Sequence, residues 1–271
     1  MKVSIVTISY NQGKFLERAI KSVIEQDYND IEYIVVDPGS TDGSREVIER
    51  YRSKINKIIF EPDEGPADGL NKGFAHATGD ILGYINADDA YLPGAVRKAV
   101  QVFQSDSSLD VVYGWGYIIK LNGNMIKRFR STSFNLWRFV YGGVWIMQQS
   151  TFFKRESFLD VGGFNIENGN SWDGELLLDF GLSGKKFKLV RDYWSVFVIH
   201  DSSITGSQRL QKEYLCDSLR MFEKIIGRDR KRIDVMFRLI ARLQKWLLDP
   251  VGFFFRIKER MTCYFYKRPW I

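Results

Sequence analysis

Acidic and amide side chains follow two apolar segments that lie about fifty residues apart. Asp37 comes directly after the apolar run 31–36, and the sequence Asn86-Ala87-Asp88-Asp89 follows the apolar run 81–85. In an open α/β sheet, ligands bind in the crevice at the carboxyl ends of the strands, so both clusters are expected to face one cleft. Carboxylate and amide oxygens suit a hard divalent cation, and such a cation suits a diphosphate. These residues predict an enzyme that handles a metal-bound nucleoside diphosphate.

The length and composition of the chain limit the classes of protein to which it can belong. Its 271 residues are enough for one large core, and no apolar run approaches the ~18 residues of a membrane-spanning helix. The N-terminal run 3–8 has no cleavage-site pattern after it, so a first strand is expected there and not a signal peptide. Cys216 and Cys263 lie far apart without a CxxC spacing, which predicts free thiols in a reducing compartment, the cytoplasm.

The first hundred residues alternate apolar strands with amphipathic helical segments. Such a series predicts a parallel sheet that is covered by helices on both faces. Strands are expected at 3–8, 32–36, 57–60 and 81–85, and helices at 14–26, 42–51, 66–76 and 93–104.

After about residue 105 the pattern changes. Two strands are predicted around the hairpin turn 122–124, which has the sequence Asn-Gly-Asn. The sequence therefore predicts one domain over 1–206, with a nucleotide half 1–105 and an acceptor half 106–206, and a helical tail 207–271. The elements expected in the second half are strands at 111–121, 125–129, 150–153, 187–190 and 194–199 and helices at 134–140 and 173–182.

Five motifs in order along residues 3–205 resemble glycosyltransferase family 2, in its bacterial polysaccharide-biosynthesis branch. The resemblance implies the α/β GT-A fold, here with a C-terminal helical appendage. It also implies an inverting, metal-dependent transfer of one sugar from a nucleoside diphosphate donor, expected to be a UDP-sugar. The Q-x-x-R-W signature of processive synthases does not follow Asp173, which favours one transfer per encounter. The motifs are Ser4–Asn11, Asp37–Gly43, Glu61–Gly73, Asn86–Asp89, and Val161–Phe164 with Asp173–Leu176.

The resemblance assigns several residues to the donor. Asp37 is expected to accept a hydrogen bond from the imide N–H of a pyrimidine, and Tyr10 to stack on the base. The alternative for Asp37 is a cap of the helix that follows it. Thr7 and Asp68 lie in the same motifs and are also assigned to the donor. Lys72 is expected to reach the diphosphate as a point charge, unless it is an ordinary solvated lysine.

A metal site is expected at Asn86 and Asp88, which have the spacing of the D-x-D element of the family. Asp88 is the first predicted ligand of Mn²⁺ or Mg²⁺, and Asn86 is expected to meet the ribose or a metal-bound water. Asn86 stands where the family often has Asp, so one negative charge is lost while a hard oxygen remains. His200 is the second predicted ligand. A capping turn is the alternative for Asp88, a half-buried structural role is the alternative for His200, and Asp89 has no assigned role.

Asp173 is predicted to be the general base, since an inverting transfer needs a carboxylate that takes the proton of the acceptor hydroxyl. It begins a predicted helix after the Gly/Asn-rich stretch 165–171, which is expected to be a mobile loop. An Asp at a helix N-terminus is also an ordinary capping residue, and Glu175 is a second candidate for the base. The acceptor pocket is expected to include Trp145, Gln148 and Gln149, unless these are core and strand-edge residues.

The tail 207–271 is basic, with 16 Lys and Arg against 7 Asp and Glu. It contains a predicted amphipathic helix, 233–248, and two aromatic-rich runs, 251–255 and 264–270. This composition fits an anionic membrane interface, which predicts a peripheral protein at the inner face of the cell membrane and a polyprenyl-diphosphate-linked saccharide as acceptor. The alternative is an appendage whose apolar stripe packs on the catalytic domain or on a second subunit. The stripe consists of Met236, Phe237, Ile240, Leu243 and Leu247.

Three other classes of function fit the sequence less well. A dinucleotide-dependent oxidoreductase would carry G-x-G-x-x-G after its first strand, and a nucleotidyltransferase would carry a Gly-rich loop there; neither is present. The third class is a non-catalytic basic protein that binds membrane or nucleic acid through its tail. It would leave Asp37, Asp88 and Asp173 without a role. Outside the tail the chain is mildly acidic, so no nucleic-acid partner is expected.

Overall fold

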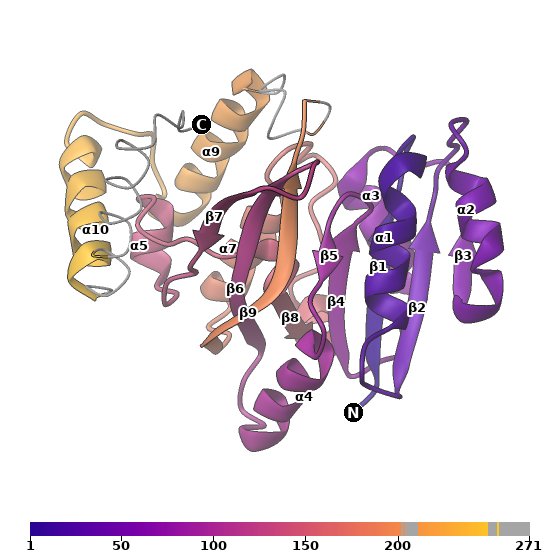
Figure 1. The fold of residues 1–271 in the computed structure, drawn as a ribbon. Coiled ribbons are helices and arrows are strands. Elements are labelled where there is room, and N and C mark those ends of the chain that lie inside the picture. The colour runs from indigo at the N-terminus through magenta and orange to yellow at the C-terminus, as the bar shows by residue number, and fades with distance from the viewer. Residues whose placement is uncertain (202, 204–210, 249–253, 255–271) are drawn as a thin grey trace.

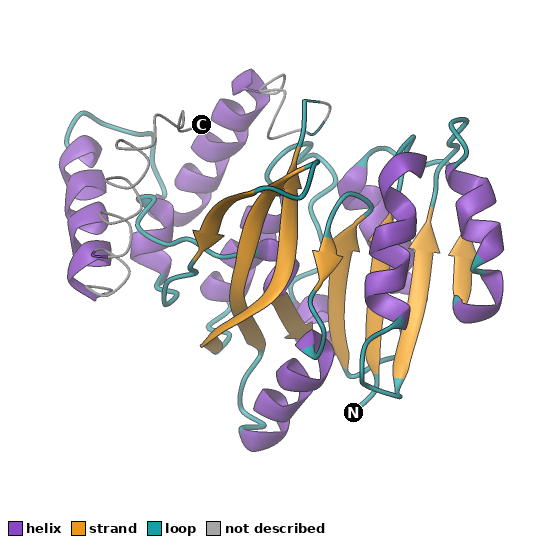
Figure 2. Ribbon diagram, in the orientation of Figure 1, coloured by secondary structure: helices purple, strands orange, loops and turns teal. Residues whose placement is uncertain are grey.

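The computed structural model describes residues 1–201, 203, 211–248 and 254 (Figure 1). Within these residues, nine strands form one sheet with helices packed against it (Figure 2). The strand order is β3-β2-β1-β4-β8-β6-β9-β5, and β7 pairs with β6. The N-terminal strands occupy one side of the molecule in Figure 1, and the two C-terminal helices occupy the other.

The first half of the sheet is parallel, as the alternation of strands and helices predicts. Its strands β1, β2 and β4 are almost continuously buried, which is typical of a sheet with helices on both faces. The elements are β1 (Val3–Ile8), α1 (Gly13–Ile24), β2 (Ile31–Val36), α2 (Ser44–Arg50), η1 (Arg52–Lys54), β3 (Lys57–Ile59), α3 (Pro66–Ala75) and β4 (Ile81–Asn86).

The second half is mixed. Strand β8 lies antiparallel between β4 and β6, while β6 and β9 run parallel. The elements are β5 (Ala90–Tyr91), α4 (Ala95–Ser105), β6 (Val111–Lys120), β7 (Met125–Phe129), α5 (Leu136–Val140), η2 (Gln148–Ser150), β8 (Thr151–Lys154), α6 (Arg155–Asp160), α7 (Trp172–Leu182) and β9 (Phe187–Ile199).

Three predictions for this half need correction. The two strands expected at 187–190 and 194–199 are one strand, β9, because the chain stays extended through 191–193 and Tyr193 pairs with Trp115 of β6 after a register shift. The two-residue strand β5 and the six-residue helix α6 are absent from the prediction, because neither is long enough to show a period.

Two apolar clusters hold the helices on opposite faces of the sheet. Helices α1, α2 and α4 pack on one face through residues such as Leu16, Ile48 and Val96. Helices α3 and α7 pack on the other face, where Phe74 and Phe180 are buried. The two faces explain why the strand sequences are apolar on both sides and show no alternation.

The helices α9 (Gln211–Ile226) and α10 (Asp234–Leu248) lie beside α5. A third apolar cluster joins them through Tyr141, Phe222 and Ala241. Among the described residues, no helix is both long and apolar enough to cross a membrane. The boundary expected at residue 206 and the aromatic runs 251–255 and 264–270 lie outside the described residues, apart from the exposed Phe254.

A buried carboxylate ties the amino end of β1 to β2. Glu32 accepts hydrogen bonds from Lys2 Nζ (2.8 Å) and Ser4 Oγ (2.5 Å), and also from the backbone N–H of Thr78 (2.7 Å). Burial by itself would raise the pKa of the Glu32 carboxyl, but these donors prevail and lower it to about 2.

We expect Glu32→Gln to reduce the free energy of unfolding at pH 7 by about 2 kcal/mol, since the lowered pKa reflects stabilisation of the charged carboxylate. A lowered pKa contributes stability that is present above the unfolded value of 4.5 and is lost as the pH falls toward 2. Urea unfolding from pH 7 to pH 3 measures the difference between wild type and variant. A difference that stays constant over this range would contradict the assignment.

Candidate active site

A cavity of about 580 Å³ opens at the carboxyl ends of β1 and β4. The nucleotide half contributes Tyr10, Asn86 and Asp88 to its wall, and the acceptor half contributes Gln148 and Asp173. The cluster after β4 therefore faces the cavity, and the segment after β2 reaches it through Pro38, whereas Asp37 itself is not part of the wall.

Three neighbouring parallel strands each deliver one buried oxygen that has no hydrogen-bond partner in the described part of the chain. They are Ser9 Oγ after β1, Asp37 Oδ2 after β2 and Asn86 Oδ1 at the end of β4. An unsatisfied buried polar atom costs about 1–3 kcal/mol, so such atoms are rare in folded proteins. Three of them along one edge of a sheet indicate a site where a ligand supplies the missing hydrogen bonds.

Asp37 is fully buried, and its two carboxylate oxygens differ. Oδ1 accepts hydrogen bonds from the backbone N–H of Ser40 (2.8 Å) and from Arg45 Nε (3.2 Å), whereas Oδ2 is the unpartnered atom. Helix α2 begins only at Ser44 with Gly43 as its N-cap, so Asp37 does not cap it. The structure thus leaves one acceptor of Asp37 for a ligand, while Arg45 holds the carboxylate in place.

Asp88 and His200 come together although they are far apart in the sequence. Asp88 Oδ2 lies 3.1 Å from His200 Nε2, and the imidazole packs against the ring of Phe15 with centroids 4.6 Å apart. The Arg18 side chain donates to the backbone carbonyl of Asp88 and fixes the turn. Burial raises the pKa of the Asp88 carboxyl, and the neighbouring His200 opposes that rise.

Asp89, by contrast, is bonded within the protein and is completely buried. Its Oδ1 accepts from the backbone N–H of Val198 (2.9 Å), and its Oδ2 accepts from Gln149 Nε2 (2.8 Å). Burial raises its pKa well above the usual value, and the negative charge of Asp88 adds to the rise. Asp89 therefore connects strand β9 and η2 to the end of β4, which gives it a structural role.

A divalent cation fits the donor atoms at this end of the sheet. Asp88 supplies a carboxylate, His200 an imidazole nitrogen, and Asn86 an unpartnered amide oxygen. Among the described residues, no three or more His, Cys, Asp and Glu side chains are placed so that together they could hold a metal ion. A cation held by one or two protein ligands together with substrate phosphates is the usual arrangement for Mg²⁺ in phosphate-handling enzymes.

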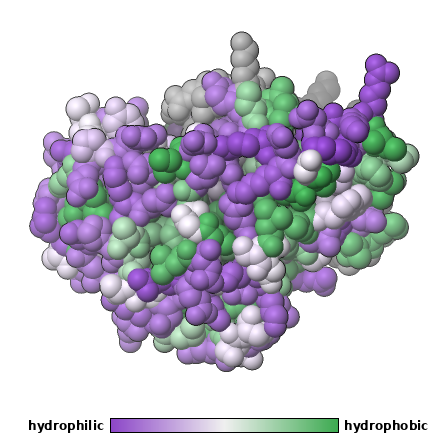
Figure 3. Space-filling view, turned by 180° about the vertical axis from the view of Figure 1, so that it is seen from behind, coloured by the Kyte–Doolittle hydropathy of each residue, from purple (hydrophilic) through white to green (hydrophobic). Residues whose placement is uncertain are grey.

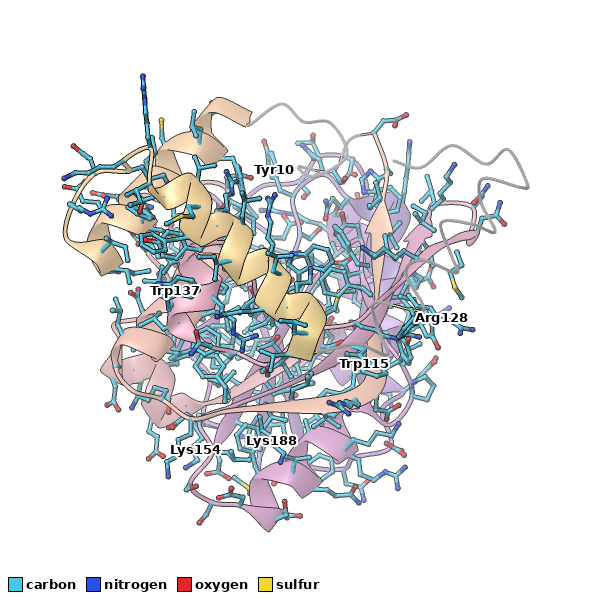
Figure 4. The ribbon with its side chains drawn as sticks, turned by 90° about the vertical axis from the view of Figure 1, so that its left-hand side faces the viewer. Tyr10, Trp115, Arg128, Trp137, Lys154 and Lys188 are labelled. Atoms are coloured by element: carbon cyan, nitrogen blue, oxygen red, sulfur yellow. The ribbon has the colours of Figure 1, made fainter. Side chains whose placement is uncertain are left out.

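The loop after β1 presents Tyr10 at the cavity with 63% of its surface exposed. Figure 4 shows Tyr10 near the top of the molecule. Asn11 adopts a left-handed conformation (φ +52°), donates its backbone N–H to Ser40 Oγ (2.8 Å), and accepts from the backbone N–H of Thr41 (2.9 Å). The loops after β1 and β2 are therefore joined, which holds Tyr10 close to Asp37.

Four residues assigned to the donor lie outside the cavity wall. One is the buried Asp37, whose neighbour Pro38 lines the cavity. Thr7 is buried in the sheet, where its hydroxyl accepts from Tyr33 OH (3.0 Å). Asp68 and Lys72 pair with each other at 2.7 Å one helical turn apart, and Lys72 also donates to the carbonyl of Pro62. In the same motif it is Asp63 that lines the cavity, with its pKa raised by burial.

The sequence does not single out Asp63, because a motif with several carboxylates does not indicate which of them faces the cavity. Its Oδ1 accepts from the backbone N–H of Gly65 (3.0 Å), an Asx turn that precedes α3. The Asp63-x-Gly65-Pro66 spacing is the local signal that could have identified it, since Asp followed by Gly-Pro is typical of a turn before a helix.

Asp173, in the first turn of α7, also lines the cavity. Burial raises the pKa of its carboxyl above the ordinary value of 3.8, and hydrogen bonding to the backbone N–H of Gly174 counteracts part of the rise. Such a group is a better proton acceptor than an exposed aspartate.

Glu175 is buried and is not part of the cavity wall, and both of its carboxylate oxygens have hydrogen-bond partners. It accepts from Asn165 Nδ2 (3.0 Å), Asn168 Nδ2 (2.7 Å) and Arg220 of α9 (2.7 Å). Burial would raise its pKa, but these donors and the charges of Arg220 and Lys224 lower it. Because both of its oxygens accept hydrogen bonds, Glu175 is suited to hold the loop 165–171 in place and not to act as the base.

The residues expected in the acceptor pocket take different positions. Gln148 and Gln149 both line the cavity, although the amide of Gln149 is committed to Asp89. Trp145 lies outside the wall, where the ammonium groups of Lys127 and Lys245 approach its ring. The backbone then leads from Trp145 directly into Ile146 and Met147, which do line the cavity.

Sequence relatives place the chain in a family. Residues 4–162 match the sequence model "Glycosyl transferase family 2". An uncharacterized glycosyltransferase of Nostoc is 41% identical over 117 residues, and one of Mycobacterium tuberculosis is 32% identical over 179 residues, 65% of this chain. A GalNAc(5)-diNAcBac-PP-undecaprenol beta-1,3-glucosyltransferase of Campylobacter jejuni is 30% identical over 132 residues, 47% of this chain. The matches span 36%, 67% and 42% of the lengths of these relatives.

Solved structures share the fold. TarS 1–349 of S. aureus in complex with UDP-GlcNAc superposes with a TM-score of 0.67 at 18% identity, covering 91% of this chain and 72% of that one. The mannosyltransferase PcManGT of Pyrobaculum calidifontis, in complex with GDP-Man and Mn²⁺, gives 0.63 at 21% identity, covering 91% and 69%. With the GT-A fold and the matching family model, the chain belongs to glycosyltransferase family 2.

Proposed function

We propose that this protein is an inverting, metal-dependent glycosyltransferase that transfers one sugar per encounter from a UDP-sugar. Its acceptor is a saccharide or a polyprenyl-diphosphate-linked saccharide in the assembly of a cell-surface polysaccharide. The observation that carries this proposal is the row of unpartnered oxygens of Ser9, Asp37 and Asn86, together with a cavity that both Asp88 and Asp173 line. The UDP-GlcNAc in TarS and the undecaprenol-linked substrate named for the Campylobacter jejuni relative support the donor and acceptor classes.

The nucleotide half binds the donor. Asp37 Oδ2 accepts the N3–H of uracil, and the ring of Tyr10 covers the base. Asn86 and Ser9 hydrogen-bond the ribose or the water around the diphosphate. Asp63 lines the same cavity.

Asp88 and His200 would hold a divalent cation, Mn²⁺ or Mg²⁺, and Asn86 would supply a further oxygen to the cation or to its water. When bound, the cation neutralises the charge that develops on the departing diphosphate. The Mn²⁺ in the mannosyltransferase PcManGT supports a divalent metal for this fold. Arg18 and Asp89 keep the turn that carries Asp88 in place.

Asp173 takes the proton of the acceptor hydroxyl as that oxygen forms its bond to the anomeric carbon. The attack comes from the side opposite the nucleotide, the bond from the anomeric carbon to the diphosphate oxygen breaks, and UDP leaves with the electron pair. The configuration at that carbon is thereby inverted, so an α-linked donor gives a β-linked product. Asp173 lines the same cavity as Asp88, which supports this role.

We expect Asp88→Ala to weaken UDP binding in the presence of Mn²⁺ at least tenfold, about 1.4 kcal/mol, because a metal ligand is lost. For the wild type, EDTA should weaken binding to a similar extent. Calorimetric titration of UDP measures both effects. Asp106→Ala, which removes an exposed carboxylate far from the cavity wall, is the matched control. Equal affinities for the wild type with Mn²⁺, the wild type with EDTA and Asp88→Ala would refute the metal site.

We expect Asp37→Asn to reverse the preference between pyrimidine nucleotides. Uracil N3–H needs an acceptor, whereas cytosine N3 is itself an acceptor and suits the amide N–H of asparagine. UDP should therefore bind at least tenfold more weakly to the variant, while CDP should bind as well as or better than it does to wild type. Parallel titrations of both nucleotides make each the control for the other. An equal loss for UDP and CDP would indicate a structural role of Asp37.

We expect Asp173→Asn to lower the transfer rate at least a hundredfold while the affinity for UDP stays within a factor of two. Because burial raises the pKa of Asp173, the wild-type rate should fall on the acidic side with a midpoint above 3.8, where the base becomes protonated. The assay is UDP release from UDP-sugars in the presence of a bacterial lipid extract, followed from pH 4 to pH 8. Full activity in Asp173→Asn would refute its role as the base.

A further inference from the structure

Helix α10 presents an apolar face away from the protein. Apart from the terminal Leu248, six large apolar side chains of this helix have between 36% and 80% of their surface exposed. At 100° per residue they fall within an arc of about 140°, so they form one continuous face. This outer face of α10 consists of Val235, Met236, Leu239, Ile240, Leu243 and Leu247.

The inner face of α10 is fixed against the acceptor half. Asp234 is buried and accepts hydrogen bonds from Tyr141 OH (3.0 Å) and Arg228 Nη1 (2.8 Å). Ala241 is also buried, and a Cβ placed on Gly143 would come within 2.5 Å of its carbonyl oxygen, so only a glycine allows the helix to lie this close. These contacts set the rotation of the helix and leave the outer face uncovered.

This rotation bears on the two alternatives that the tail sequence left open. Of the five stripe residues, Phe237 packs inward, against Tyr141 and Trp137. Met236, Ile240, Leu243 and Leu247 are at least 36% exposed. The described helix therefore packs on the catalytic domain with one side and offers most of its apolar stripe to another surface. A monomer in water rarely exposes a continuous apolar patch of this kind without a binding function.

The charges around the outer face of α10 indicate what kind of partner binds there. Arg238 and Arg242 are exposed along one border of the outer face. The chain then continues with five basic residues and several aromatic ones between 256 and 270. A second copy would bring this basic surplus against itself, whereas an anionic lipid surface complements it. Apolar residues flanked by Arg are the pattern of a helix that lies in the plane of a bilayer interface.

We propose that the outer face of α10 docks onto an anionic phospholipid bilayer. Its apolar side chains enter the boundary between headgroups and acyl chains, and Arg238 and Arg242 contact the lipid phosphates. Helix α10 is the element nearest the viewer in Figure 4, at one end of the molecule, so nothing in the described fold stands between this face and a flat surface. The corresponding right-hand edge of Figure 3 carries hydrophobic residues.

The docked helix is linked to the cavity wall. Gly143 touches α10 at Ala241, Lys245 of α10 covers the ring of Trp145, and the next residues, Ile146 and Met147, line the cavity. A bilayer bound at α10 would therefore lie on the acceptor side. This consequence rests on the proposed function, whereas docking itself does not require catalysis.

The test is flotation of the full chain with vesicles of phosphatidylglycerol and phosphatidylcholine, compared with vesicles of phosphatidylcholine alone. We expect wild type to float with the anionic vesicles, and Leu239→Asp/Leu243→Asp to lower the partition coefficient at least tenfold. The matched control is Leu159→Asp/Leu182→Asp, two equally exposed leucines on α6 and α7, which should float like wild type. Asp88→Ala should also float like wild type, which separates docking from nucleotide binding.

Thermal unfolding and UDP titration of the α10 variant establish that it is folded. Equal flotation of wild type and the α10 variant would overturn the proposal, as would wild type that does not float. Light scattering that finds a dimer in wild type and a monomer in the variant, without flotation of either, would assign the face to a second copy of the chain. Equal flotation with neutral and anionic vesicles would overturn the role of Arg238 and Arg242.

Discussion

The carboxylate of Asp89 connects the segments from which the cavity is built. It lies at the end of β4, yet its two oxygens bind the backbone of β9 at Val198 and the side chain of Gln149 in η2. Asp88, His200 and Gln148 lie next to or close to these three residues in the sequence. They are the groups that face the cavity or the proposed metal position. Removing one partner of a buried, hydrogen-bonded charge is strongly destabilising. Separating the two halves of the site would therefore cost free energy. The alignment of Asp88 with His200 depends on this connection.

A second buried carboxylate performs the same task on the acceptor side. Glu175 binds Asn168, and Asn168 Oδ1 in turn accepts the backbone N–H of Ser171 (2.7 Å), which leads into Asp173. Arg220 of α9 closes the network at Glu175. The loop 165–171, expected from its composition to be mobile, is therefore anchored from the C-terminal helices. Helix α9 belongs to the frame of the candidate base, although sequence alone assigned it to a separate tail.

Sequence reasoning worked best where a physical rule fixes position. Strand ends in a parallel sheet meet at one edge, so the placement of Asn86 and Asp88 at the cavity, with Asp37 close to its wall beside Pro38, followed from the apolar runs before them. The rule does not give side-chain direction. Thr7 lies in the strand itself and is buried, and Asp68 lies two residues past Pro66, the last residue of its segment that reaches the cavity. Nor could the pattern decide the rotation of α10, since that depends on the close contact with Gly143.

The unpartnered oxygens at Ser9, Asp37 and Asn86 link stability to function. Each buried acceptor without a partner costs the protein free energy, and all three lie at the carboxyl ends of the paired strands β1, β2 and β4. The core around these strands keeps the three atoms in place, and Arg45 and the joined loops after β1 and β2 hold the backbone around them. A ligand that satisfies these atoms recovers the cost and stabilises the fold by mass action. The same core that buries the strands therefore keeps this edge ordered for the donor that we propose.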